Sequence, residues 1–562
     1  MLPAVPVAGY HRLSIGAEDV QLAVAPRRCY GVRDAVPGSR PWVLAVQLYA
    51  LRRDGDAGLG DFDALKDLAT AAARHGAAGM AISPVHAQFS ADPDRFSPYS
   101  PSSRLMLNVL HTGLDVPPDE ETRRLEASEL VDWPVASRKR LHTMRAMFDN
   151  ASPVELAALS AYRDAEGDGL ETHARFEALH AHLFGSDPGR WHWRTWPEQF
   201  RQPGNPAVAA FAQEHEREVA LHAYMQMLAD RSLRGAQAAA LAAGMPIGLI
   251  ADLAVGADSG GSHCWSRQEE TLLGLTIGAP PDLLSPSGQS WGLAAFSPRG
   301  LVRHGFGAYL DMLRSAMRHA GGVRIDHAMG LSRLWVVPDG ASAADGAYIQ
   351  FPVQDMLRLI ALESQRNRAI VLGEDLGTVP EGFEAELDGA GILGMRVLWF
   401  ERKEERFNPP STWTPGAAAM TTTHDLPTVA GWWSGHDLDW RHRLDLFGSP
   451  ENDRAENQAR ATDRQALWAA LGSTGATPPP DQPDAVVDAA IHHIGTASCA
   501  LAILPIEDAL ASPEQPNLPG TLDQHPNWRR RHPGPAGLLL EPPAVAARLR
   551  SLTEARVAQE SA

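Results

Sequence analysis

Short apolar runs alternate with amphipathic stretches along most of the chain. Eight runs rich in Val, Ile, Leu and Ala occur at 42–48, 78–82, 247–253, 323–325, 369–372, 395–400, 418–423 and 501–505. Such runs are typical of strands in a parallel sheet that is covered on both faces. The stretches between them, for example 62–74 and 353–366, have apolar residues at helical spacing. Eight cycles of strand and helix predict an α/β protein built on a (β/α)8 TIM barrel.

Two intervals between these strands are too long for ordinary loops. The first, 84–245, contains predicted helices at 154–162, 173–183 and 207–243, which indicates a mainly helical insertion subdomain after the second strand. The second, 254–322, carries clusters of Gly, Pro and Ser and is predicted to form loops over one mouth of the barrel. The barrel then comprises 41–83 and 246–535, with a C-terminal helix and tail at 536–562. Residues 1–40 alternate weakly and predict an N-terminal β segment packed on the barrel.

Composition excludes several classes of partner. The net charge of -18 would repel nucleic acid and anionic membrane surfaces, and the one basic cluster, 529–531, is predicted to be a solvated face. The three cysteines lie far apart, without the spacing of a disulfide framework or a zinc site. No stretch approaches 18 uninterrupted apolar residues. We therefore expect a cytoplasmic protein.

Acidic residues follow several of the predicted strands. Asp252 ends the third strand, Asp326 the fourth, Glu374 and Asp375 the fifth, and Asp425 the seventh. One such residue alone is more often a cap or an ion-pair partner, but the carboxyl ends of barrel strands meet at one solvated mouth, where these folds place active sites. Converging carboxylates without metal-binding His or Cys predict glycoside chemistry, which needs one carboxylate to attack and one carboxylic acid to protonate the leaving oxygen.

Other side chains fit a sugar site. Arg324 is two residues before Asp326, so on a strand both point to the same face and Arg324 can keep Asp326 ionised. Aromatic and amide side chains on the predicted loops could bind sugar rings and hydroxyls: Tyr99, Gln289 and Trp291. Trp432 and Trp433 are predicted to be core residues.

No cofactor is implied by the sequence. His173, His180 and His182 are predicted on a solvated helix rather than at a metal, and no phosphate loop or dinucleotide fingerprint follows a strand.

Seven sequence strings carry a family resemblance: SPYSPSSRLMLNV, GAPPDLLSPSGQSWGL, VRIDHAMGLSRLW, DGAYIQFP, GEDLGTVPEGF, TTTHDLPTVAGWW and NLPGTLDQHPNWRRR. In this order they span 97–531 and resemble the amylomaltases, the 4-α-glucanotransferases of glycoside hydrolase family 77. The resemblance implies a retaining enzyme that transfers segments of α-1,4-glucan between maltooligosaccharides and other α-glucans, without a metal or organic cofactor.

Roles are carried over residue by residue. The resemblance makes Asp326 the nucleophile, Glu374 the general acid/base, and Asp425 the carboxylate that binds and distorts the sugar being cleaved. It also implies a set of substrate-binding residues: Ser97, Tyr99, Asp252, Asp282, Gln289, Trp291, Arg324, His327, His424 and Asn517.

Three departures from the family pattern leave the catalytic residues in place. Leu284 stands where many relatives carry an aromatic residue in the covering loop, Pro516 replaces a usual aliphatic residue, and residues 1–40 resemble only the end of a longer N-terminal accessory region. Two alternatives stay open: an amylase-like hydrolase, and a catalytically silent glucan-binding protein. The sequence does not specify donor length, cyclic products or oligomeric state.

Overall fold

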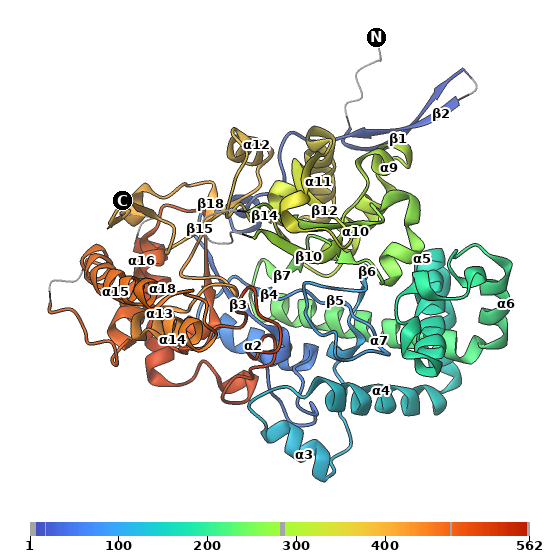
Figure 1. Ribbon diagram of the computed structural model, residues 1–562, viewed down its shortest axis with the longest axis horizontal. Coiled ribbons are helices and arrows are strands. Elements are labelled where there is room, and N and C mark those ends of the chain that lie inside the picture. Colours follow the sequence, from blue (N-terminus) through green and yellow to red (C-terminus); the bar gives the residue numbers. More distant parts are fainter. Residues whose placement is uncertain (1–6, 17, 282–286, 473–474, 559–562) are drawn as a thin grey trace.

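Eight parallel strands form the centre of the molecule. The computed structural model describes residues 7–16, 18–281, 287–472 and 475–558 (Figure 1). The strands are β3 (Trp42–Val46), β4 (Gly79–Ile82), β7 (Gly248–Leu253), β11 (Gly322–Ile325), β14 (Ile370–Gly373), β15 (Gly394–Val397), β18 (Ala417–Met420) and β19 (Leu501–Pro505). Their order is β14-β11-β7-β4-β3-β19-β18-β15. Hydrogen bonds from Leu393 to Val371 and from Gly373 to Leu393 close the ring between β14 and β15. Each strand coincides with one predicted apolar run, so the predicted barrel is confirmed.

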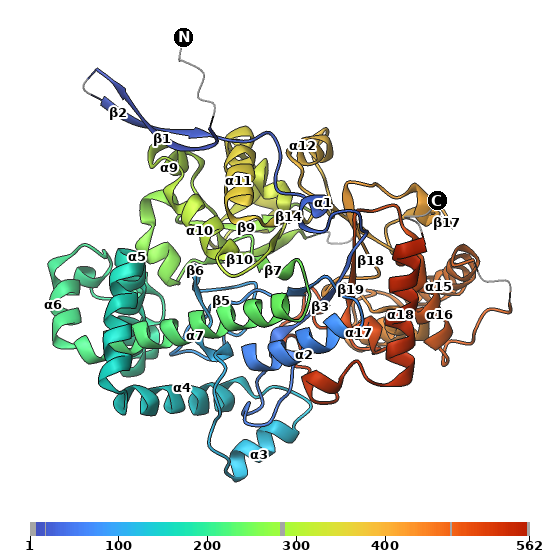
Figure 2. The same ribbon diagram turned by 180° about the vertical axis from the view of Figure 1, so that it is seen from behind.

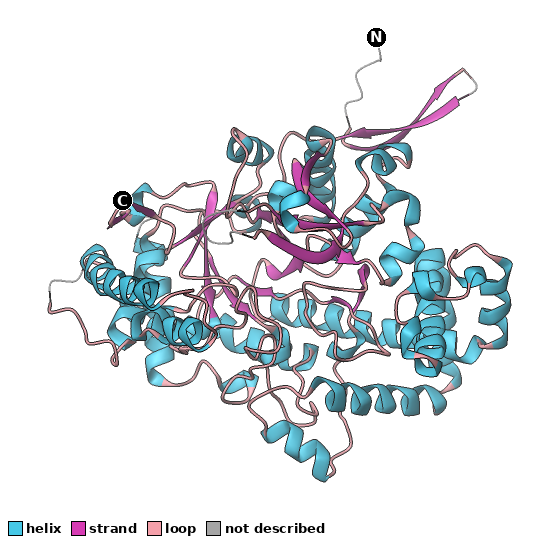
Figure 3. Ribbon diagram, in the orientation of Figure 1, coloured by secondary structure: helices cyan, strands magenta, loops and turns pink. Residues whose placement is uncertain are grey.

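Apolar side chains fill both faces of this sheet. Val43, Ile250, Ile370, Met395 and Ile503 belong to one buried cluster made by the strands themselves. Helices cover the outside (Figure 3): α2 (Phe62–Arg74), α10 (Gly307–Met317), α11 (Val353–Asn367), α12 (Phe383–Ala390), α13 (Val429–Ser434), α16 (Asp484–Thr496), α17 (Ile506–Ala509) and α18 (Pro543–Ala558). The bounds of α2 are the predicted ones, because the Asp61 side chain caps its first turn and most of its apolar residues are buried on one side.

The interval 84–245 contains a short hairpin followed by helices. The hairpin is β5 (His86–Ala87) and β6 (Ser103–Leu107), and the helices are α3 (Glu120–Ala127), α4 (Trp133–Asp149), α5 (Pro153–Ser186), α6 (Pro206–Glu214) and α7 (Glu216–Ala242). Helix α5 joins two predicted helices across a kink at Gly167, which has a positive φ of 61°. Helix α7 packs on α5 and also on α2 and β7, so it covers the barrel as well as the insertion.

The prediction of loops at 254–322 is wrong. This interval contains β8 (Ala257–Asp258), α8 (Ser262–Ser266), β9 (Leu275–Ala279), β10 (Gln289–Ala294) and α9 (Pro298–Arg303). With β12 (Arg333–Pro338) and β13 (Ala347–Gln350), its strands form an antiparallel sheet in the order β13-β12-β9-β10-β8. Because the strands are short and glycine-containing, and two pairing partners lie beyond residue 322, the local pattern alone does not reveal them.

The N-terminal strands form a hairpin, β1 (Gly9–Ile15) and β2 (Glu18–Val24), that projects from the body of the molecule (Figures 1 and 2). Only the base of this hairpin packs on the body: the Tyr10 hydroxyl donates to Glu363 at 2.5 Å, whereas Ile15 and Val20 are exposed. The remaining elements are α1 (Val32–Ala35), α14 (His436–Arg443), α15 (Pro450–Ala470), β16 (Arg402–Lys403) and β17 (Arg406–Phe407). No helix within the described ranges is long and apolar enough to cross a membrane.

Candidate active site

The predicted carboxylates meet at the carboxyl ends of the barrel strands. Asp326, Glu374 and Asp425 all line one cleft of about 670 Å³. This is within the range of roughly 300–1,000 Å³ that is common for small-molecule sites. The cleft is bordered by loops from the strand ends, by β10 of the antiparallel sheet, and by the segment between β5 and β6.

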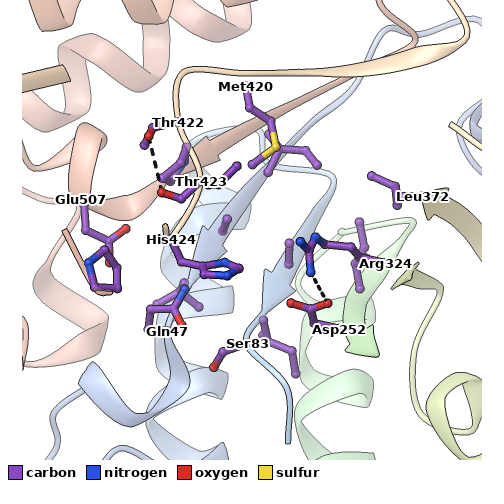
Figure 4. Close-up of a pocket in the computed structure, with 18 of the residues that line it drawn as sticks. Gln47, Ser83, Asp252, Arg324, Leu372, Met420, Thr422, Thr423, His424 and Glu507 are labelled. Carbon is purple, nitrogen blue, oxygen red and sulfur yellow. Dashed lines mark hydrogen bonds and ion pairs between the residues drawn. The ribbon is translucent and has the colours of Figure 1, made fainter. Parts of the chain in front are cut away.

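Arg324 joins two of the acidic residues. Arg324 and Asp252 are register partners on the neighbouring parallel strands β11 and β7, so their side chains point to the same side of the sheet. Arg324 Nη1 lies 2.6 Å from Asp252 Oδ1 (Figure 4) and 3.0 Å from Asp326 Oδ1. Burial acts to lower the pKa of Arg324, but Asp252 and Asp326 outweigh it and hold that pKa well above its usual value. The guanidinium of Arg324 therefore stays charged next to the Asp326 carboxylate.

Glu374 is held by backbone amides instead of a cation. Its two oxygens accept hydrogen bonds from the N–H groups of His327, at 2.8 Å, and Leu376, at 3.0 Å. His327 has a left-handed backbone with φ of 47°, and the next residue, Ala328, donates its N–H to the carbonyl oxygen of Glu374 at 2.8 Å. Burial raises the pKa of both Asp326 and Glu374, while Arg324 acts against this rise. Asp326 contacts the guanidinium directly, which favours its ionised form, whereas the cation acts on Glu374 only from a distance and burial outweighs the two amide donors.

Asp375 has a different surrounding from its neighbour Glu374. The side chain of Asp375 accepts a hydrogen bond from Met395 N at 2.7 Å and pairs with Arg396 at 3.0 Å. It is 5% exposed and does not border the cleft. Of the two acidic residues after β14, Glu374 is therefore the one that faces the site.

Asp425 is bound from both sides. Asn517 Nδ2 donates to Asp425 Oδ1 at 2.6 Å, and His424 Nε2 lies 3.4 Å from Asp425 Oδ2. Burial acts to raise the pKa of Asp425, but His424 and Asn517 outweigh it and hold that pKa below its usual range. The His424 ring stacks on Tyr99 with centroids 4.6 Å apart, and the Tyr99 hydroxyl donates to Asp252 at 2.6 Å. Through His424 and Tyr99, these contacts connect Asp425 to Asp252, the ion-pair partner of Arg324.

The remaining predicted binding residues lie on two sides of the same cleft. Trp291, on β10, donates to Gln289 Oε1 at 2.9 Å and meets the His327 ring edge-on at 5.3 Å. Ser97 lines the cleft from the segment between β5 and β6. The structure thus brings together every predicted site residue that it describes. Asp282 and Leu284 lie outside the described residues.

Sequence reasoning missed Trp528. Its buried ring lies 5.4 Å from Tyr99 and 5.5 Å from His424, and it also borders the cleft. The residue stands in the string NLPGTLDQHPNWRRR, from which only Asn517 was selected. An aromatic residue in this otherwise polar, turn-rich string was a usable signal.

The core prediction for Trp432 and Trp433 is confirmed by their burial. Two surface predictions are wrong, one for the basic cluster 529–531 and one for the histidines of helix α5. Arg531 in the basic cluster is fully buried and forms an ion pair with buried Asp56. His173 and His180 are also buried, because helix α5 is enclosed by α7 and α8, although the neighbouring His182 is exposed. In the described part of the chain, no group of three His, Cys, Asp or Glu side chains is placed to hold a metal ion.

Comparison with known proteins identifies the family. The model of glycoside hydrolase family 77, described as 4-alpha-glucanotransferase, matches residues 46–536. The 4-alpha-glucanotransferase of Mycobacterium tuberculosis is 34% identical over 600 residues, covering 99% of this chain and 80% of that protein. That of Haemophilus influenzae is 30% identical, covering 97% of this chain and 83% of that protein. The crystal structure of amylomaltase from Corynebacterium glutamicum has a TM-score of 0.84 at 27% identity and covers 98% of this chain and 81% of that one. The chain belongs to glycoside hydrolase family 77, the 4-α-glucanotransferases.

Proposed function

We propose that this 4-α-glucanotransferase acts by a retaining double displacement in which Asp326 is the nucleophile and Glu374 the acid and base. In the first step, an Asp326 oxygen attacks the anomeric carbon while Glu374 gives its proton to the departing glycosidic oxygen. The bond from carbon to the leaving oxygen breaks and a glucosyl-enzyme ester forms. In the second step, the 4-hydroxyl of an acceptor glucan attacks the same carbon, Glu374 takes its proton, and Asp326 is released.

The observation that carries this assignment is the difference in contacts between the carboxylates. Asp326 pairs with partly buried Arg324, which favours the ionised form that a nucleophile needs. Burial raises the pKa of Glu374, which favours the protonated form that an acid needs, and outweighs its two amide donors, which act to lower that pKa. Asp425, with a lowered pKa, supplies a fixed negative charge for the oxocarbenium-like transition state.

The proposed binding roles follow from the same geometry. Tyr99 offers a ring face to the sugar in the cleaved subsite, and Trp291, which lines the same cleft from β10, offers another. The substrates we propose are maltooligosaccharides and other α-1,4-glucans, within maltodextrin or glycogen metabolism. The cytoplasmic location and the division into a barrel and a helical insertion stay predictions.

Maltotriose as the sole substrate tests this function against its two alternatives. Transfer should give glucose and a ladder of longer oligosaccharides, with little increase in reducing ends, when the products are separated by chromatography. An increase in reducing ends without a ladder would indicate an amylase-like hydrolase. Unchanged maltotriose that still binds to the chain would indicate a catalytically silent glucan-binding protein.

A further inference from the structure

The segment that carries Ser97 and Tyr99 to the cleft is attached to helix α5 of the insertion. This segment, 88–102, connects β5 to β6. Near its start, both the backbone N–H and the hydroxyl of Ser90 donate to Glu177 Oε2, the N–H at 3.2 Å. Gln88 Nε2 donates to the carbonyl oxygen of Ser97 at 3.0 Å, which connects the start of the segment to the part that lines the cleft. Glu177 thus binds the start of the segment, and Gln88 connects that start to Ser97.

Glu177 and Gln88 share an unusual feature. Both line a small cavity of about 20 Å³, and in the described structure Glu177 Oε1 and Gln88 Oε1 are buried without a hydrogen-bond partner. The orientation of the Gln88 amide is fixed, because its nitrogen donates to Ser97. Each of these buried acceptors requires a donor, since an unsatisfied buried polar group costs about 1–3 kcal/mol. A protonated Glu177 supplies that donor, directly or through one water molecule, for which the cavity has room.

The surroundings of Glu177 favour the protonated form. Its side chain is 3% exposed, and burial raises its pKa to about 7 although the Ser90 bonds act to lower it. The titratable groups nearby are His173 and His180 on α5 and His222 on α7. Burial lowers the pKa of His173 to about 3 and those of His180 and His222 to about 4. These rings are therefore neutral near pH 7 and supply no positive charge that would ionise Glu177.

We propose that Glu177 is a positioning residue for the transfer reaction. In its protonated form it accepts from Ser90 and donates toward Gln88, and so fixes the segment that presents Tyr99 to the donor sugar. Loss of the proton leaves a buried charge on Glu177 and no donor from it for the Gln88 oxygen, which loosens the segment from α5. This inference rests on the proposed function, because Tyr99 matters only if the cleft binds a sugar.

Kinetics on maltotriose separate positioning from a purely structural role. Glu177→Gln keeps one acceptor for Ser90 and one donor for Gln88, so its KM should stay within about twofold of the unsubstituted chain. Glu177→Met removes both and should raise KM about tenfold with kcat changed less than threefold, because the sugar contact is misplaced while the carboxylates are untouched. Glu363→Met is the matched control: Glu363 is 1% exposed and does not border the cleft, so this variant should lose stability without a change in KM. An unchanged KM in Glu177→Met would overturn the proposal.

Thermal melting tests the protonation itself, independently of activity. A carboxyl whose folded pKa of about 7 exceeds its ordinary value of 4.5 destabilises the folded chain as pH rises between these values. The Tm of Glu177→Gln minus that of the unsubstituted chain should therefore rise from pH 5 to pH 7 and then level off. A constant difference would overturn the proposal, even if Glu177→Met fails to fold. An unsubstituted chain that is inactive on maltotriose would instead contradict the proposed function, and the melting curves would still decide whether Glu177 holds the proton.

Discussion

Asn517 and Asp425 are joined by a hydrogen bond of 2.6 Å, although they belong to loops that follow different strands of the barrel. The backbone N–H of Asn517 also donates to the carbonyl of His424 at 3.1 Å, which holds the two loops together. The amide side chain therefore both orients the Asp425 carboxylate and lowers its pKa. Asn517 thus adds to the larger effect of His424 in keeping Asp425 ionised.

Asn517→Ala should lower kcat/KM on maltotriose about 10- to 100-fold, because a hydrogen bond to a charged group contributes about 1.5–3 kcal/mol. Removing the donor also raises the pKa of Asp425, so the acid limb of the activity profile should move to higher pH. Rates measured from pH 4 to pH 8 check both effects. An acid limb that stays in place would show that Asn517 does not influence the charge of Asp425.

Asp326→Asn and Glu374→Gln should fail at different steps with an α-glucosyl fluoride donor, whose leaving group needs little protonation. Asp326→Asn removes the attacking charge, so no glycosyl-enzyme should form. Glu374→Gln should lose about 10²–10⁴-fold of its rate on maltotriose, yet it should form the intermediate from the fluoride and accumulate it, because the base for the second step is missing.

Mass spectrometry of the digested Glu374→Gln variant should place the added sugar on the peptide that contains 323–327. A sugar on the peptide with Glu374 or Asp425, or an adduct formed by Asp326→Asn, would refute the assignment of the nucleophile.

Trp291→Ala should weaken the use of acceptor sugars and increase the share of hydrolysis, because a lost stacking ring costs about 1 kcal/mol and admits water to the intermediate. The ratio of new reducing ends to transfer products measures this share. Trp468→Ala is a matched control: this ring is also half-buried with one hydrogen bond, to Gly475, but it does not border the cleft. Equal loss of transfer and hydrolysis in Trp291→Ala, with a lower Tm, would show a structural role only.

His180→Leu should make the chain more resistant to acid. His180 lies between the rings of Phe176 and Phe184, and burial lowers its pKa to about 4. A histidine with a depressed folded pKa contributes stability above its unfolded pKa of about 6.5 and loses it as pH falls toward 4. The free energy of unfolding of His180→Leu, relative to the unsubstituted chain, should therefore increase by about 2 kcal/mol from pH 7.5 to pH 5.

Urea denaturation at the two pH values measures this difference. His182→Leu is the control for replacing a histidine by leucine on this helix, because His182 is exposed. A relative stability of His180→Leu that does not depend on pH would contradict the expected proton linkage.

The sequence by itself determined the barrel and the chemistry at its mouth. Buried parallel strands need continuous apolar runs, and such runs mark all eight strands without knowledge of their partners. The acidic residues that end these strands must converge, because parallel strands in a closed barrel present their carboxyl ends at one mouth. For this reason Asp252, Asp326, Glu374 and Asp425 could be selected before their contacts were known.

Only the tertiary structure decided features that depend on residues distant in the chain. The sheet that includes β10 is assembled from strands on both sides of β11, so no local pattern predicts it. Trp528 contacts Tyr99 across more than 400 positions of the sequence. The same holds for charge and burial: Arg531 is buried because Asp56 compensates it, and Glu177 has a raised pKa because helices enclose it. A side chain's polarity is written in the sequence, but its exposure and its partners exist only once distant segments pack together.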